Sequence, residues 1–284
     1  MTVLAETRTE HGGLTHAERR MFTDDVLETV ASACRKVLIL PPDHTRCNSG
    51  AGEITAFAYE HLASTAQVDI MPALGTHAPM SVEERTRMFG AQIPEDRFRV
   101  HDWRNNLAFC GEVSARQMHT WSEGKFAEPV RVEIDNVCFD DYDLILSVGQ
   151  IVPHEVAGMA NYTKNVCVGV GGPDIINKSH FLGAVYGMER IMGRTGTPVR
   201  QLYNYAVGTY LKTLPIQYIF TVVAPEEDGA GMAVKGLFAG DDAETFQRAA
   251  RLSQQVNMSF VDEPLENVVV YLAPAEFKST WLGN

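Results

Sequence analysis

Leu144-Ile145-Leu146-Ser147-Val148 is a nearly continuous apolar run, and it leads into the segment Gln150-Ile151-Val152-Pro153-His154. An unbroken run of this kind is typical of a strand covered on both faces, as in a parallel sheet. Val37–Leu40 is a second such run and is also followed by a polar loop. The pattern predicts an α/β fold with a Rossmann-like, largely parallel sheet and helices on both of its faces.

The rest of the chain alternates β-rich runs with helical ones. Strands are expected at Val37–Leu40, Val68–Leu74, Phe98–Trp103, Val130–Ile134, Leu144–Val148, Val166–Val170, Ile216–Val223, Val234–Phe238 and Val268–Leu272. Helices are expected at Thr23–Arg35, Ala51–Ser64, Val82–Phe89, Asp174–Met192, Pro198–Gly208 and Ala243–Gln255. In sheets of this class ligands bind at the carboxyl ends of the strands, so the loops that follow strands are the places to search for a site.

Composition excludes several classes of function. The net charge of −12 argues against nucleic acid or an anionic membrane as the main partner. No apolar run approaches the roughly 20 residues that a membrane-spanning helix needs, and residues 1–20 do not resemble a signal peptide. The protein is therefore expected to be cytoplasmic. Five widely spaced cysteines without a CxxC pair indicate reduced thiols rather than disulfides or a structural zinc site.

Three loops that follow strands carry side chains suited to chemistry. The first contains Asp43-His44-Thr45-Arg46, the second Gly75-Thr76-His77, and the third runs from His154 through Lys164 to His180. Taken singly, each residue has an ordinary explanation, such as a turn cap or a solvated surface side chain. If the preceding strands share one parallel sheet, however, these side chains meet at one edge of it.

The stretch Val152–Gly183 resembles the signature of the nickel-dependent lactate racemase family. In that family a Pro-His, a loop of small residues, a lysine, a glycine-rich turn and an Asn-x-x-His follow one another in this order. Lys164 lies ten residues after His154, and His180 lies sixteen after Lys164, as in the family pattern. The two upstream loops also resemble family motifs, so the likeness runs from about Leu38 to Gly183.

The resemblance implies a nickel-pincer nucleotide as cofactor, a pyridinium mononucleotide whose ring carbon and two sulfurs bind nickel. Lys164 would carry it covalently through a thioamide, and His180 would supply the fourth nickel ligand. Proteins that build this cofactor would be partners. A rigid three-point ligand completed by one imidazole favours a square-planar metal, and nickel is the family's choice.

The resemblance also implies roles for the two upstream loops and for His154. His77 and His154 would be two acid/base groups, Arg46 would bind the substrate carboxylate, and Asp43 would orient a histidine or the arginine. Racemisation requires access to both faces of a carbon, and histidine exchanges protons near neutral pH. Arginine suits a carboxylate because its fork reaches both oxygens. The implied function is a racemase or epimerase of a 2-hydroxy acid, either lactate-like or a sugar acid.

The chain departs from the family pattern at three places, which bear on the substrate more than on the reaction. Asn161-Tyr162 stands where glycine-rich or Ser-Gly residues are frequent, Cys47 where a proline is common, and Ala78 where an arginine is frequent. Family members also continue into a second α/β domain. Residues 1–264 are therefore expected to form the cofactor- and substrate-binding domain, and 265–284 the beginning of a second, truncated one.

Two other classes of function stay open at this point. One is a 2-hydroxy acid oxidoreductase or lyase with a conventional metal, and the other is a non-catalytic binding protein that kept the fold. A scaffold would have no reason to keep Lys164 and His180 in register. An NAD-linked dehydrogenase would carry G-x-G-x-x-G after the first strand, where this chain has Asp43-His44-Thr45-Arg46-Cys47-Asn48 instead.

Overall fold

A central β-sheet organises the protein in the computed structural model, which describes residues 3–226 and 231–259 together with residues 261, 263, 267 and 269. Within these residues the sheet has six strands in the order β1-β10-β9-β6-β2-β3. The strands β2 (Lys36–Leu40), β3 (Gln67–Ile70), β6 (Leu144–Gln150) and β9 (Ile216–Pro225) are parallel. Two antiparallel strands, β10 (Met232–Gly240) and β1 (Ala5–Arg8), complete one edge. The predicted, largely parallel α/β sheet is confirmed.

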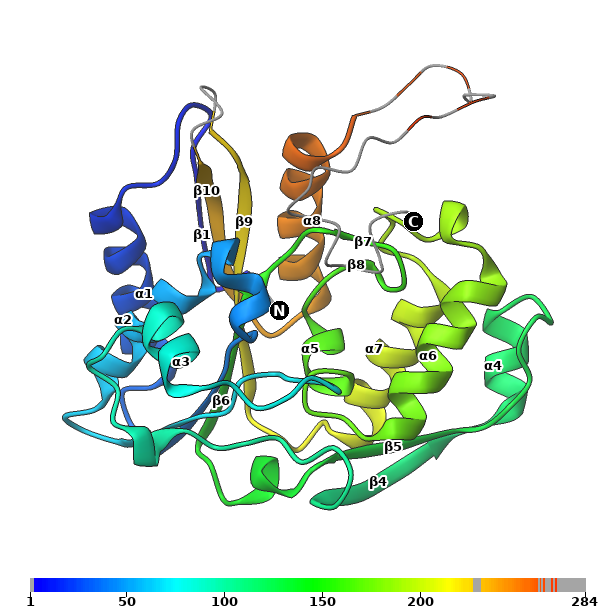
Figure 1. Ribbon diagram of the computed structural model, residues 1–284, viewed down its shortest axis with the longest axis horizontal. Helices are drawn as coiled ribbons and strands as arrows, with labels where there is room; N and C mark the ends of the chain where they lie inside the picture. Colours follow the sequence, from blue (N-terminus) through cyan, green and yellow to red (C-terminus); the bar gives the residue numbers. More distant parts are fainter. Residues whose placement is uncertain are drawn as a thin grey trace.

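Helices cover both faces of the sheet, as the unbroken apolar runs predicted. Val37 and Ile39 of β2 pack with α1 (His16–Val30), α2 (Ala51–Leu62) and α3 (Val82–Phe89). Leu38 and Leu40 belong to the opposite face, where α5 (Thr163–Cys167) contributes Val166. On that face α8 (Ala243–Asn257) packs against β9 and β10 (Figure 1). Of the helices in the described residues, none is long and apolar enough to cross a membrane.

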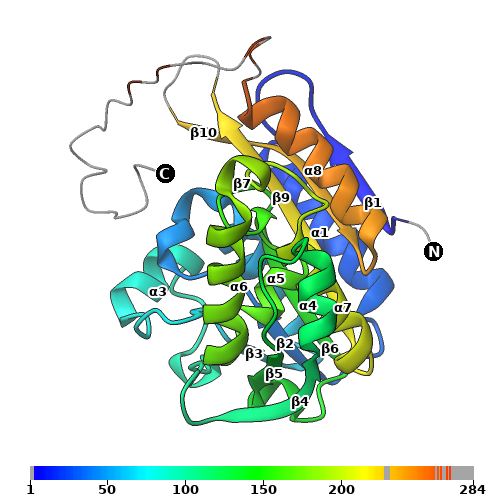
Figure 2. The same cartoon turned by 90° about the vertical axis from the view of Figure 1, so that its right-hand side faces the viewer.

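A second layer of structure lies beside α5. It is formed by elements that come between β3 and β9 in the chain. The antiparallel pair β4 (Leu107–Val113) and β5 (Val130–Asp135) packs with α4 (Ala115–Trp121), α6 (Pro173–Tyr186) and α7 (Pro198–Tyr210) around a separate apolar cluster. Figure 2 shows these helices in front of the central sheet. This layer matters for the site because α5, α6 and α7 each carry residues that surround the expected cofactor lysine.

Two expected strands are wrong. Val166–Val170 lies partly in helix α5, where the amide of Val168 donates to the carbonyl of Lys164 at 2.8 Å. Both edges of β6 are already paired, with β2 and with β9, so no free strand edge is left beside it. Phe98–Trp103 makes only one bridge, from Phe98 to Ile70, before the chain leaves the sheet.

Other differences concern element boundaries. Helix α1 begins at His16 rather than at Thr23, because Thr15 and Glu18 form a capping box there. Helix α6 ends at Tyr186, since Gly187 takes a φ of 106°. The expectations missed β1, β4 and α4. The strand expected at Val268–Leu272 and the segment 265–284 lie outside the described residues, apart from residues 267 and 269.

Candidate functional site

The three loops singled out from the sequence lie together at the carboxyl ends of β2, β3 and β6. The side-chain amide of Asn165 on α5 donates to the carbonyl of Leu40 at 3.1 Å and to the hydroxyl of Ser147 at 2.9 Å. It thereby fixes α5 on the ends of β2 and β6. The amide of Gly75 donates to the carbonyl of Gly169 at 2.9 Å, which joins the loop after β3 to the turn after α5.

Asp43 and His77 form a direct pair across two of these loops. Asp43 is buried and caps the 3-10 helix η1 (His44–Ser49) by accepting from the amide of Thr45. Its Oδ2 lies 2.6 Å from Nδ1 of His77, whose side chain is 56% exposed. The hydrogen bond to Asp43 raises the pKa of His77. Burial works to raise the pKa of Asp43, but the hydrogen bonds from His77 and Thr45 outweigh it and lower that pKa.

His154 ends the short strand β7 (Pro153–His154) and has the opposite environment. Its side chain is buried, and burial together with the charges of Lys164 and Arg46 brings its pKa well below the usual value. Nδ1 accepts the backbone N–H groups of Val156 at 3.0 Å and Ala157 at 3.3 Å. The neutral ring therefore has its proton on Nε2, and His154 offers a hydrogen-bond donor to the site.

Lys164 lies on α5 among the other candidate residues. Burial, followed by the charges of Arg46 and Arg200, lowers the pKa of its amine to about 8. The positive charge of Lys164 in turn lowers the pKa of His154 and His180 and counteracts the rise at His77. An amine of this pKa is half deprotonated at pH 8, and only the neutral form is a nucleophile.

His180 lies on α6 and is half-buried. Its Nδ1 is 2.7 Å from the carbonyl of Ile176, to which it donates, so the lone pair of the neutral ring is on Nε2. Burial lowers its pKa, although the hydrogen bond to Ile176 acts in the other direction. A neutral imidazole whose orientation is fixed through one nitrogen is the usual form of a histidine metal ligand. In the described part of the chain, no three His, Cys, Asp or Glu side chains are grouped to hold a metal ion by themselves.

Arg46 is exposed on η1, and within the described ranges its side chain makes no ion pair. Its charge nevertheless acts on His77, His154 and Lys164. A guanidinium that is close to the other groups and not committed to a protein carboxylate is available for an anionic ligand. The structure thus brings all six residues expected from the sequence into one electrostatic cluster.

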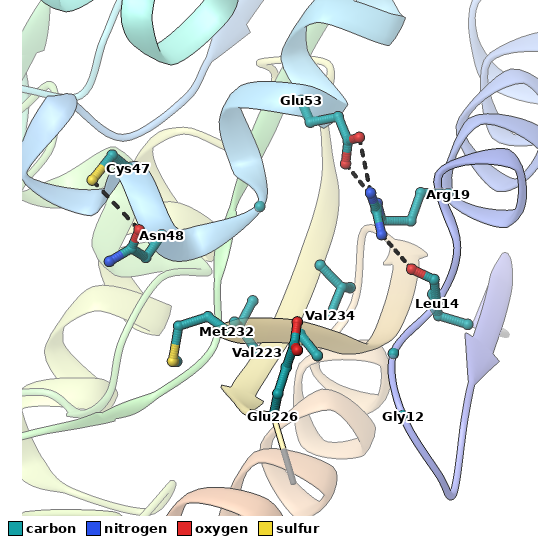
Figure 3. A pocket seen from close by; sticks show the side chains of 13 residues that line it. Gly12, Leu14, Arg19, Cys47, Asn48, Glu53, Val223, Glu226, Met232 and Val234 are labelled. Carbon is teal, nitrogen blue, oxygen red and sulfur yellow. Dashed lines mark hydrogen bonds and ion pairs between the residues drawn. The ribbon is translucent and has the colours of Figure 1, made fainter. Parts of the chain in front are cut away.

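A cavity of about 750 Å³ adjoins the site but contains none of these six residues. It is lined by Cys47 and Asn48 of η1, by Met232 of β10, and by Arg19, which pairs with Glu53 (Figure 3). Arg19 is the one cation among the described residues that line the cavity, and it is already bound to that carboxylate. We place the site around Lys164 and not in this cavity.

Sequence reasoning missed Arg200, a buried residue on α7 that contacts the loop before Lys164. It falls outside the motif stretch, but a signal was present. Arg200 is a charged residue beside the apolar stripe Val199, Leu202, Tyr203 and Ala206 of the expected helix, and such residues are seldom buried without a role.

Known proteins resemble this chain in sequence. The sequence model of a family described as the lactate racemase N-terminal domain matches residues 3–191. A lactate racemase of Thermoanaerobacterium thermosaccharolyticum is 27% identical over 159 residues, which are 54% of this chain and 34% of that protein. A lactate racemase of Lactiplantibacillus plantarum is 26% identical over 220 residues, 76% of this chain and 47% of that protein. The chain thus spans between a third and a half of the length of these curated relatives.

A solved structure shares the fold. The crystal structure of a Thermotoga maritima protein superimposes with a TM-score of 0.78 at 24% sequence identity, over 90% of this chain and 63% of that chain. The comparison supports the overall fold of this chain.

Proposed function

Because the chain belongs to the family of the lactate racemase N-terminal domain, we propose that it takes part in the racemisation or epimerisation of a small 2-hydroxy acid, lactate-like or a sugar acid. The proposed cofactor is a nickel-pincer nucleotide linked to Lys164. The observation that carries the proposal is the position of the Lys164 amine, which lies among His77, His154 and His180 and has a pKa of about 8.

The residues present suit this cofactor in two respects. The neutral fraction of the Lys164 amine is available for covalent attachment, and Nε2 of His180 has a lone pair available for nickel. When bound, the cofactor supplies an electrophilic pyridinium that accepts hydride from the substrate carbon and returns it. Asn165 fixes the helix that carries Lys164 on the sheet, so the attachment point is rigid.

His77 and His154 are proposed to exchange the hydroxyl proton of the substrate, one on each face of the reacting carbon. They come from different loops and their pKa values move in opposite directions, a difference that is typical of acid/base pairs. Asp43 orients His77 through the 2.6 Å contact. Because Nδ1 of His154 accepts two backbone N–H groups, the neutral ring offers only a hydrogen bond from Nε2–H. His154 can act as a base through Nε2 only after these two hydrogen bonds break and the ring proton moves to Nδ1.

Arg46 is proposed to bind the substrate carboxylate. It is exposed, makes no ion pair within the described residues, and its charge reaches both proposed acid/base histidines. Its fork can hold both carboxylate oxygens, which would fix the carbon next to the carboxylate between the two rings. The proteins that build the cofactor are the proposed partners of the chain.

Mass spectrometry of protein produced together with the cofactor-building enzymes tests the proposal. We expect the added mass of the nucleotide on the peptide that contains Lys164, and its loss in Lys164→Ala. Lys178→Ala is the matched control, because Lys178 is a nearby lysine that binds Asp174 and the carbonyl of Pro129 instead. An unmodified Lys164 peptide in nickel-replete, active protein would contradict the proposal.

A further inference from the structure

The turn directly before Lys164 has backbone dihedral angles that favour glycine, yet it contains no glycine. Asn161 and Tyr162 both have a φ of 59°, and they lie directly before α5. Positive φ is disfavoured for residues with a β-carbon, and such turns persist only where the surroundings fix them. The surroundings of this turn must therefore supply the constraint.

Arg200 supplies it from α7. One guanidinium nitrogen donates to the carbonyl of Asn161 at 3.0 Å and to the hydroxyl of Thr163 at 3.1 Å, and the other donates to the carbonyl of Met159. The hydroxyl of Thr163 donates in turn to Asn204, one helical turn further along α7, at 2.7 Å. One side chain thus binds residues 159, 161 and 163, immediately before the lysine.

The charge of Arg200 has no counter-ion in the part of the chain that the structure describes. The residue is 1% exposed, its Nε has no acceptor, and the Phe246 ring centroid lies 4.7 Å from its Cζ. Burial lowers the pKa of Arg200 to about 10. Burying an unpaired cation is costly, and a neutral amide could also donate to two carbonyls. The buried cation also acts on the ionisable groups around it, Lys164 among them.

The charge of Arg200 acts on Lys164, as it does on Tyr162, Cys167 and His154. Burial has the largest effect on its amine, followed by the charges of Arg46 and Arg200, while Glu155 and Asp43 act in the opposite direction. The groups that face Lys164 come from η1, α6, α7 and the loops after β2, β3 and β6. They are Asp43, Arg46, His77, His154, Glu155, His180 and Arg200.

We propose that Arg200 is a positioning residue for Lys164: its three hydrogen bonds fix the strained turn directly before the lysine. Its buried cation, which has no counter-ion among the described residues, lies beside that turn and opposes a second positive charge on the lysine amine. The inference rests on the proposed covalent role of Lys164. In that step the nitrogen lone pair of Lys164 forms a C–N bond with the thiocarboxyl carbon of the nucleotide. The C–O bond of that group breaks, and water leaves with one amine proton and the hydroxyl of the thioacid. No oxidant or reductant is needed.

Competitive labelling of the apoprotein with acetic anhydride measures the amine directly. The labelling of Lys164 is followed by peptide mass spectrometry from pH 6 to pH 10, with the exposed Lys212 as internal reference. The wild-type midpoint is expected near 8. Arg200→Gln, which keeps two donors but no charge, should raise the midpoint by about one unit and slow labelling at pH 7.5 about tenfold. Arg8→Met, which removes an exposed arginine on β1, should leave the midpoint unchanged.

Arg200→Lys removes the planar fork that makes the three hydrogen bonds, and a lysine buried there would itself be partly neutral, as Lys164 is. Amide hydrogen exchange at residues 161–165 should become faster in this variant because the turn is no longer fixed. If Arg200→Gln does not fold, Arg200→Lys alone tests the positioning role. Amide hydrogen exchange that is unchanged in Arg200→Lys would overturn that role. An unchanged midpoint in folded Arg200→Gln would overturn the electrostatic role.

Different results would refute the proposed function and the inference about Arg200. If holoprotein contains no adduct on Lys164 while Arg200→Gln still raises the labelling midpoint, the proposed function is wrong and the inference about the amine stands. If the adduct forms on Lys164 and the midpoint does not move, the proposed function stands and Arg200 has only a structural role.

Discussion

The positive φ of Tyr162 predicts that glycine is tolerated better than alanine at this position, the reverse of the usual order. The ring of Tyr162 is 8% exposed and lies 5.0 Å from Phe246, in a stacked arrangement, and 4.9 Å from Tyr218. Removing such a ring should cost about 3–5 kcal/mol of unfolding free energy in either variant. The two variants therefore differ only in how well alanine and glycine tolerate the backbone conformation at position 162.

The size of that difference follows from the dihedral angles. Tyr162 has φ 59° and ψ −134°, a conformation natural to glycine. At an ordinary position Gly is less stable than Ala by roughly 0.5–1 kcal/mol, but a non-glycine residue in a disfavoured region costs about 1–3 kcal/mol. We therefore expect Tyr162→Gly to be more stable than Tyr162→Ala by about 1 kcal/mol, and both to be less stable than the wild type.

Urea denaturation followed by circular dichroism measures the two free energies. Glu28, exposed on α1, provides the matched control, because Glu28→Gly should be less stable than Glu28→Ala by about 1 kcal/mol. If Tyr162→Ala is as stable as Tyr162→Gly, or more stable, then the turn before Lys164 is not strained, and the argument that Arg200 must fix it loses its basis.

Three further predictions concern the candidate site. His180→Ala should retain the adduct on Lys164 but lose most of its nickel on dialysis, as metal analysis would show; equal nickel content in variant and wild type would exclude a ligand role. His77→Ala and His154→Ala should each slow turnover about 10²–10⁴-fold in both directions. In single-turnover mixing, only one enantiomer of the substrate should reduce the cofactor in each variant. Equal reduction by both enantiomers would refute the assignment of the two histidines to opposite faces of the reacting carbon. Asp43→Asn should lower the pKa of His77 measured by NMR, because the hydrogen bond that His77 donates to Asp43 raises it. The Asp43–His77 pair should stabilise the fold most at pH values between the lowered pKa of Asp43 and the raised pKa of His77. This contribution should decline as pH rises through the pKa of His77. A stability difference between Asp43→Asn and the wild type that grows over that range would contradict the expected pH dependence.

Local sequence was sufficient for the sheet, and it indicated which loops lie together at the ends of the strands. The apolar run of β2 alternates between the two faces, with Val37 and Ile39 on one and Leu38 and Leu40 on the other, so it had to be a strand covered by helices on both sides. A parallel sheet brings the ends of its strands to one edge. The loops with Asp43 and His77 could therefore be predicted to meet, because each follows its strand closely in the chain. Lys164 belongs to the connection that follows β6, although β7 lies between them.

Tertiary contacts decided what the local pattern could not. Val166–Val170 contains β-branched residues that favour a strand, yet both edges of β6 were occupied and the segment folded partly as helix. The ring forms of His154 and His180 depend on which nitrogen meets a backbone N–H group and which meets a carbonyl.

The turn before Lys164 also combines a feature visible in the sequence with one that only the fold reveals. The sequence marks Asn161 and Tyr162 as departures from a glycine-rich pattern, but their positive φ is visible only in the fold. Arg200, 39 residues from the carbonyl of Asn161 to which it donates, is the group that fixes them. Strand formation depends on the order of neighbouring side chains, whereas protonation, ring orientation and backbone strain depend on groups that only folding brings within hydrogen-bonding distance.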